Sequence, residues 1–209
     1  MQLNVAEVYM KTAVMIGDSH SQIVFPLLKE KLPFQFDAVV SKPGWGIRKF
    51  MQENIIPSLP NAEICIVGLG GNNMNTDSVS YGAELASFLD LLKSKYKRIV
   101  WIGPYFSDEE SVNKRHYWTN AFLKVALPSN IGYIDVYDIS KPISRQDGVH
   151  SNRSGYETIV SQILPRLEQL STASSFVLWL KQPHVILSVG IAVASFVIGV
   201  VLDPLEKKG

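Results

Sequence analysis

The chain has 209 residues, which is enough for one domain with a complete hydrophobic core. Its formal net charge is +1, so bulk electrostatics gives no reason to expect nucleic acid as a partner. The single cysteine, Cys65, lies within an apolar run and cannot form an internal disulfide. We expect it to be a buried structural thiol.

Apolar runs alternate with helical patterns along most of the chain. The runs that predict strands cover residues 13–16, 36–40, 62–67, 98–102 and 132–136. The stretches that predict helices cover residues 22–31, 47–54, 79–96, 111–127 and 153–170. Pro57 is expected to end the second helix. In the fourth helix Trp118, Phe122 and Val125 are placed one turn apart.

This alternation predicts an α/β fold, namely a three-layer α/β/α sandwich around a five-stranded parallel sheet. In such sheets ligands bind at the carboxyl ends of the strands. Ser19 follows the first predicted strand, Asn72 follows the third, and the loop with Asp147 and His150 follows the fifth. We therefore expect these polar residues to meet at one edge of the sheet.

The C-terminal part of the sequence has a different character. We predict a domain over residues 1–170, a linker and interfacial segment over 171–184, a transmembrane helix over 185–202 and a short polar tail over 203–209. The segment 185–202 contains no charged residue and would measure about 27 Å as a helix, close to the hydrocarbon thickness of a bilayer. A buried core helix is the alternative interpretation.

Ser19 is the candidate nucleophile. It lies at a predicted strand-to-helix turn, where its backbone N–H is able to face a developing negative charge. A serine hydroxyl needs an adjacent base to react at neutral pH. The alternative role is to cap the following helix, although Ser21 would serve equally well as that cap.

Asp147 and His150 are the candidate acid and base. A general base of this kind needs an acceptor that fixes its far ring nitrogen, and a carboxylate three residues upstream on the same loop provides one. His20, His116 and His184 have no carboxylate at that position. The alternative is a solvated histidine after an ordinary Asp-Gly turn.

Two glycine-containing loops are candidates for binding the oxyanion. Gly70 and Gly71 allow close backbone approach, and the amide of Asn72 offers hydrogen-bond donors. Gly44 follows the second predicted strand and offers a backbone N–H, with Gly46 as the second choice. An ordinary Gly/Asn turn is the alternative for residues 70–73.

Four blocks of the chain resemble, in order, the motifs of the SGNH (GDSL-type) hydrolase superfamily, and the resemblance covers residues 11–170. The blocks are Gly17-Asp18-Ser19, Pro43-Gly44-Trp45-Gly46-Ile47-Arg48, Gly70-Gly71-Asn72-Asn73, and Asp147-Gly148-Val149-His150 followed by Gly155-Tyr156. One position departs from the pattern: Asn73 stands where the family usually has an aspartate that braces the loop.

The resemblance implies a flavodoxin-like SGNH fold and a serine esterase that needs no metal or other cofactor. Ser19, His150 and Asp147 would form the triad, and the N–H groups of Ser19 and Gly44 with the Asn72 side chain would form the oxyanion hole. Its substrates would be acetyl esters of glycans or acyl esters of lipids. The sequence offers His20, Gly46 and Trp45 as candidate contacts to the substrate, although His20 could equally be a polar neighbour and Trp45 a core or surface aromatic.

The predicted span makes the membrane a partner of the chain. With a single C-terminal span, we expect the catalytic domain to remain on the side of synthesis, in the cytoplasm or at a viral membrane. A different class of function also fits this organisation. The domain could be a non-catalytic structural or interaction module, anchored to a virion or organelle membrane and built on an esterase fold.

Overall fold

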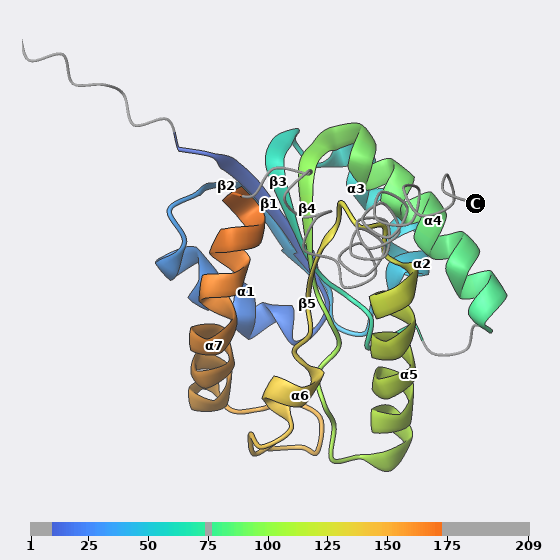
Figure 1. The fold of residues 1–209 in the computed structure, drawn as a ribbon, viewed down its shortest axis with the longest axis vertical. Helices are drawn as coiled ribbons and strands as arrows, with labels where there is room; N and C mark the ends of the chain where they lie inside the picture. The colour runs from blue at the N-terminus through green and yellow to red at the C-terminus, as the bar shows by residue number, and fades with distance from the viewer. Residues whose placement is uncertain (1–9, 74–76, 173–209) are drawn as a thin grey trace, which may run out of the picture. The chain divides into compact units, whose positions relative to one another are not determined.

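A parallel sheet lies at the centre of the computed structural model, which describes residues 10–73 and 77–172 (Figure 1). Every predicted strand is present, close to its expected range. The strands are β1 (Thr12–Gly17), β2 (Gln35–Ser41), β3 (Ala62–Gly68), β4 (Tyr96–Ile102) and β5 (Gly132–Ile134). Their spatial order is β2-β1-β3-β4-β5, and all neighbouring strands are parallel. The predicted five-stranded parallel sheet is therefore confirmed.

The strand order reverses between β1 and β3, which is where a sheet of this flavodoxin-like order opens a crevice for ligands. Gly17 pairs with Gly68, so β1 and β3 end side by side. A side-chain Cβ at Gly17 would lie 1.9 Å from the hydroxyl oxygen of Ser21. The first turn after β1 therefore packs directly against the sheet, because neither strand end carries a side chain there.

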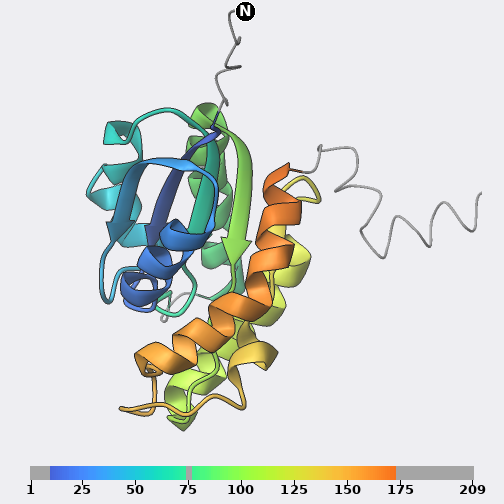
Figure 2. The ribbon, with the colours of Figure 1, turned by 90° about the vertical axis from the view of Figure 1, so that its left-hand side faces the viewer.

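Helices cover both faces of the sheet (Figure 2). One face carries α1 (Ser21–Lys31) and α7 (Arg153–Thr172). The other face carries helices that share one buried core cluster with β1, β3 and β4. These helices are α2 (Ile47–Gln52), α3 (Ile55–Ser58), α4 (Ser78–Lys95) and α5 (Glu110–Ala126).

The central strands are buried on both sides, which explains why they read as continuous apolar runs. All five residues from Ala13 to Gly17 are buried, and Ile64 to Gly68 are buried likewise. Cys65 is fully buried in β3, as expected, and desolvation raises the pKa of its thiol above the ordinary range. This thiol is therefore protonated and unreactive at neutral pH.

One local prediction was wrong, and two features of the helices were not predicted. Pro57 does not simply end the second helix, because it lies within the short helix α3, at a first-turn position where its missing N–H costs no hydrogen bond. The one-turn helix α6 (Tyr137–Ser140) was not predicted. The apolar residues spaced one turn apart along α5 do not form its buried face, since Trp118 is 65% exposed and Val125 is 82% exposed.

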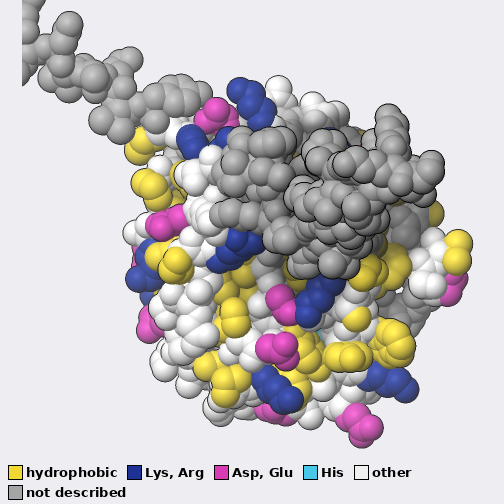
Figure 3. Space-filling view, viewed as in Figure 1, with side chains coloured by type: hydrophobic (Ala, Val, Ile, Leu, Met, Phe, Trp, Pro, Cys, Tyr) yellow, Lys and Arg dark blue, Asp and Glu magenta, His cyan; other side chains and the backbone are white. Residues whose placement is uncertain are grey.

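Charged side chains of both signs are interspersed over the described part of the face in Figure 3, in keeping with the small net charge. Within residues 10–73 and 77–172, no helix has the length and apolar character needed to cross a bilayer. The predicted linker, transmembrane helix and polar tail fall on residues 173–209 almost entirely, and those residues lie outside the described ones.

Candidate active site

Ser19 lies in the turn between β1 and α1, and its hydroxyl oxygen is 2.8 Å from Nε2 of His150. No side chain caps the N-terminus of α1. Ser21 does not act as a cap either, because its hydroxyl donates to the carbonyl of Gly68. The hydroxyl of Ser19 is therefore committed to the imidazole rather than to the helix.

Asp147 contacts His150 through both carboxylate oxygens. Oδ2 is 2.8 Å from Nδ1 of the His150 ring, and Oδ1 accepts the backbone N–H groups of Val149 and His150. The N–H of His150, followed by its ring, holds the pKa of this carboxyl well below the ordinary range. The carboxylate is therefore ionised, and it fixes the ring so that Nε2 faces Ser19.

The loop that carries Asp147 and His150 is braced from the opposite side. Gly148 adopts a left-handed conformation with φ +79°, and its carbonyl accepts the N–H of Asp108 and the hydroxyl of Ser107. The side chain of Arg145 is only 2% exposed, and its guanidinium donates to Asp108 and to the carbonyl of Phe106. These contacts tie the loop to the segment that follows β4.

The candidate oxyanion residues line one cleft with the nucleophile. This cavity measures about 320 Å³, and Ser19, Gly44, Asn72 and His150 all contribute to its wall. Gly44 has φ +73°, a backbone conformation that favours glycine. The amide nitrogen of Asn72 is 3.5 Å from the carbonyl of Trp45, a long contact that leaves the amide free to serve a stronger acceptor.

Trp45 and Gly46 do not line this cleft in the described structure. The Trp45 ring packs edge-on against Phe50, with the ring centroids 5.4 Å apart. A Cβ at Gly46 would lie 2.2 Å from Oδ1 of Asn73. That same Asn73 oxygen accepts the N–H of Ile47, the first residue of α2. The asparagine at this position therefore braces the N-terminus of α2.

His20 lines the cleft from beneath the imidazole of His150. It is 4% exposed, its ring stacks on Tyr105 at 4.4 Å, and its Nδ1 is 2.7 Å from the hydroxyl of Tyr156. Its ring centroid lies 4.8 Å from that of His150. Burial, followed by the nearby charge of His150, holds the pKa of His20 well below its ordinary value. His20 is therefore a neutral, packed neighbour of the candidate base.

Further residues of the cleft escaped the sequence analysis, although Asp18 was part of a motif. Asp18 is 4% exposed and accepts the N–H of His20, and desolvation raises the pKa of its carboxyl to about 7. His116 and Arg115 come from α5. Nδ1 of His116 is 2.6 Å from the carbonyl of Tyr105, and burial lowers the pKa of this imidazole. A polar residue on the inner side of a helix was the signal that could have identified His116.

Among the described residues, no group of three or more His, Cys, Asp or Glu side chains is placed to hold a metal ion. The contacts in the cleft are made by a hydroxyl, an imidazole and a carboxylate, with N–H donors nearby.

The sequence matches no family model and no curated protein. Its structure, however, is similar to solved structures. A lipolytic protein of the G-D-S-L family from Veillonella parvula superposes with TM-score 0.61 at 17% identity, covering 76% of this chain and 99% of that one. The chain has the fold of these proteins.

Two further structures give the same result. A catalytic mutant of Axe2, an acetylxylan esterase from Geobacillus stearothermophilus, has TM-score 0.61 and 15% identity, covering 78% of this chain and 97% of that one. The catalytic domain of peptidoglycan O-acetyltransferase A from Streptococcus pneumoniae has TM-score 0.57 and 17% identity, covering 77% and 94% of the two chains.

Proposed function

We propose that this protein is a serine ester hydrolase of the SGNH type. The observation that carries the proposal is the continuous hydrogen-bonded series from Ser19 through His150 to Asp147. The distances from Ser19 to His150 and from His150 to Asp147 are both 2.8 Å. These residues come from opposite ends of the domain. They meet in a cleft at the carboxyl edge of the sheet. This arrangement supports Ser19 as the nucleophile, His150 as the base and Asp147 as the acid that orients it.

The proposed reaction is acyl transfer through a covalent intermediate. The Ser19 oxygen attacks the ester carbonyl while Nε2 of His150 takes its proton, and the Asp147 carboxylate stabilises the resulting imidazolium. The backbone N–H groups of Ser19 and Gly44 and the amide of Asn72 hold the oxyanion. His150 then returns the proton to the leaving alcohol, and a water molecule, activated by the same imidazole, releases the acid.

The proposed substrates are acetyl esters of glycans, with lipid acyl esters as the second group to be tested. Solved structures of this fold include an acetylxylan esterase and a peptidoglycan O-acetyltransferase, which supports the first group. No cofactor enters the proposed chemistry.

Covalent labelling with a fluorophosphonate tests the mechanism directly. We expect the protein to be labelled and to hydrolyse some members of a panel that runs from acetylated sugars to long-chain lipid esters. Ser19→Ala should lose both properties, whereas the control Ser161→Ala, on the exposed side of α7, should keep them. A folded protein that resists labelling and hydrolyses nothing would instead support a non-catalytic module.

We also propose that residues 185–202 anchor the chain in a membrane, with the domain over residues 1–170 on the side of synthesis. The uncharged, apolar sequence of this segment supports the proposal. Protease treatment of sealed vesicles with their cytoplasmic face outward tests the orientation. We expect the N-terminal domain to be digested, and complete protection of that domain would contradict the orientation.

A further inference from the structure

A second cavity adjoins the catalytic cleft. It measures about 360 Å³ and is formed by side chains from α4 and α5, including Tyr81, Trp118 and Phe122, together with Asn73. Arg115 lines both this cavity and the cleft that contains Ser19. The two cavities therefore share the side chain of Arg115 as a common wall residue.

Unpaired hydrogen-bond donors gather around this cavity. Five buried side-chain polar atoms in the described residues have no hydrogen-bond partner, and three belong to residues that line it: Nδ2 of Asn73, the hydroxyl of Tyr81 and Nε of Arg115. Burial raises the pKa of Tyr81 above the ordinary range, so its hydroxyl keeps its proton. Buried donors without acceptors are costly, and a ligand rich in oxygen acceptors that draws these side chains toward it would relieve that cost.

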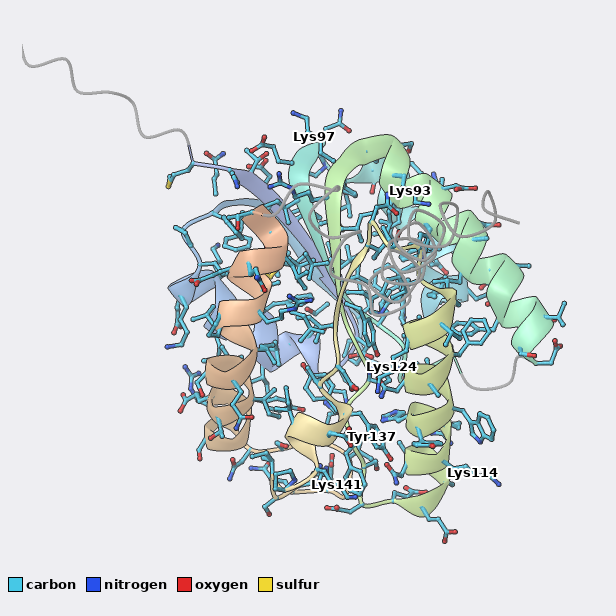
Figure 4. All side chains as sticks on the ribbon, viewed as in Figure 1. Lys93, Lys97, Lys114, Lys124, Tyr137 and Lys141 are labelled. Carbon is cyan, nitrogen blue, oxygen red and sulfur yellow. The ribbon has the colours of Figure 1, made fainter. Side chains whose placement is uncertain are left out.

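The charge on the cavity wall points to an anion. Arg115 and Lys114 both line the cavity, and within the described part of the chain no carboxylate forms an ion pair with either. In Figure 4, Lys114 extends from α5 on the side away from Tyr137. These two cations stand beside the aromatic side chains of the wall, so the cavity offers positive charge together with apolar surface.

Aromatic rings complete the cavity. Trp118 is 65% exposed, which leaves much of its side chain accessible, and the rings of Phe122 and Tyr81 pack together at 5.1 Å. Apolar ring faces beside hydrogen-bond donors suit a sugar, which carries C–H groups on its faces and oxygens around its edge.

We infer that this cavity binds the alcohol part of the substrate, and that this alcohol is a sugar bearing a carboxylate. The inference rests on the proposed esterase function. The guanidinium of Arg115 receives the carboxylate, the donors of Asn73 and Tyr81 meet sugar oxygens, and Trp118 covers one face of the ring. Because Arg115 also lines the catalytic cleft, the carboxylate lies close to the ester that Ser19 attacks.

The test compares two acetyl esters that differ only in charge: mono-O-acetyl methyl glucuronoside and mono-O-acetyl methyl glucoside. We expect kcat/KM of the wild type to favour the glucuronoside on the order of tenfold or more, as for a charge-assisted hydrogen bond. Arg115→Met should bring that ratio close to one. The matched control Arg166→Met, which replaces an exposed arginine of α7, should preserve the wild-type ratio.

A binding measurement makes the test independent of turnover. Methyl glucuronoside and methyl glucoside are titrated into folded Ser19→Ala protein and followed by NMR, with Arg115→Lys as a second variant that keeps the charge. We expect the glucuronoside to bind more tightly, and high salt to weaken that difference. Equal binding of the two sugars, or an unchanged preference in Arg115→Met, would overturn the inference. Failure of the esterase proposal looks different, because neither ester would be hydrolysed and Ser19 would resist the fluorophosphonate.

Discussion

Asp147 makes two hydrogen bonds to His150: one carboxylate oxygen contacts the imidazole ring, and the other accepts the backbone N–H. The spacing of these residues was readable in the sequence because a three-residue loop places the carboxylate within reach of its own histidine. The contact between Ser19 and His150 was predictable only through the fold, because those residues lie far apart in the chain. Asp18 and Arg115 were not predicted, because their roles depend on burial in the cleft.

Asp147→Asn should remove activity while leaving the fold intact. The amide oxygen preserves the backbone contacts, but the amide nitrogen meets Nδ1 of His150 and favours the wrong ring tautomer. We expect kcat to fall on the order of a thousandfold or more, measured with a chromogenic acetyl ester. The side chain of Asp147 is 58% exposed, so the melting temperature should change little. A loss of activity smaller than about tenfold would contradict the proposed orienting role.

Asp18→Asn should change how stability depends on pH. Burial raises the pKa of Asp18 to about 7 from an ordinary value near 3.8, so between these values the folded state holds a proton that the unfolded state releases. The contribution of Asp18 to stability therefore falls as pH rises through this window, by at most about 1.4 kcal/mol per unit. The variant lacks this dependence, because the amide does not titrate.

Urea unfolding at pH 5 and pH 8 measures the effect. The stability of Asp18→Asn relative to the wild type should be more favourable at about pH 8 than at about pH 5. Titrating groups that do not interact with Asp18 are present in both proteins and cancel in the difference. An identical difference at the two pH values would show that this carboxyl titrates normally.

Among the secondary-structure elements, the strands were the easiest to predict. A strand covered by helices on both faces must be apolar throughout, and β1 and β3 satisfy this condition. The inner side of α5 was harder, because it buries two polar side chains, Asn120 and the His116 that lines the cleft. In addition, Tyr137 of α6 donates to Asn113 of α5, as the placement of these elements in Figure 4 allows. A helix face that packs through polar contacts of this kind shows no apolar periodicity in the sequence.

The N-terminus of α2 depends on Asn73, which accepts the N–H of Ile47 across the chain. Asn73→Ala should destabilise the protein by about 1 kcal/mol, because this donor then loses its acceptor. Asn73→Asp keeps the acceptor and adds a negative charge at a helix N-terminus. We expect its free energy of unfolding to exceed that of the wild type by about 0.5 kcal/mol. Urea unfolding of both variants provides the comparison, and equal losses in both would exclude the capping role.

For the molecule as a whole, the sheet order determines where chemistry is located. The turn after β1, the loop after β3 and the loop with His150 reach one edge because every strand runs in the same direction. This much followed from the predicted architecture. The second cavity did not, because it arises where α4 and α5 pack beside each other, and no motif in the sequence marks a gap between two helices.

Membrane attachment belongs to the same scale and has its own test. Replacing Val193 and Val197 together with lysine places two charges near the centre of the predicted span, each costing about 2.5–3.5 kcal/mol on insertion. We expect the wild type to resist alkaline carbonate extraction from membranes and the double variant to be released. Release of both proteins would show that residues 185–202 do not span a bilayer.

The carbonyl of Gly148 and the buried guanidinium of Arg145 both bind the segment 106–108, and these contacts position the loop of Asp147 and His150. The carboxylate and the imidazole are joined by their own hydrogen bonds, so their spacing does not depend on those contacts. The distance from the imidazole to Ser19, on the other side of the cleft, does depend on the position of the loop. Removing those contacts should therefore leave the pair of Asp147 and His150 intact while increasing the distance from the imidazole to the Ser19 hydroxyl.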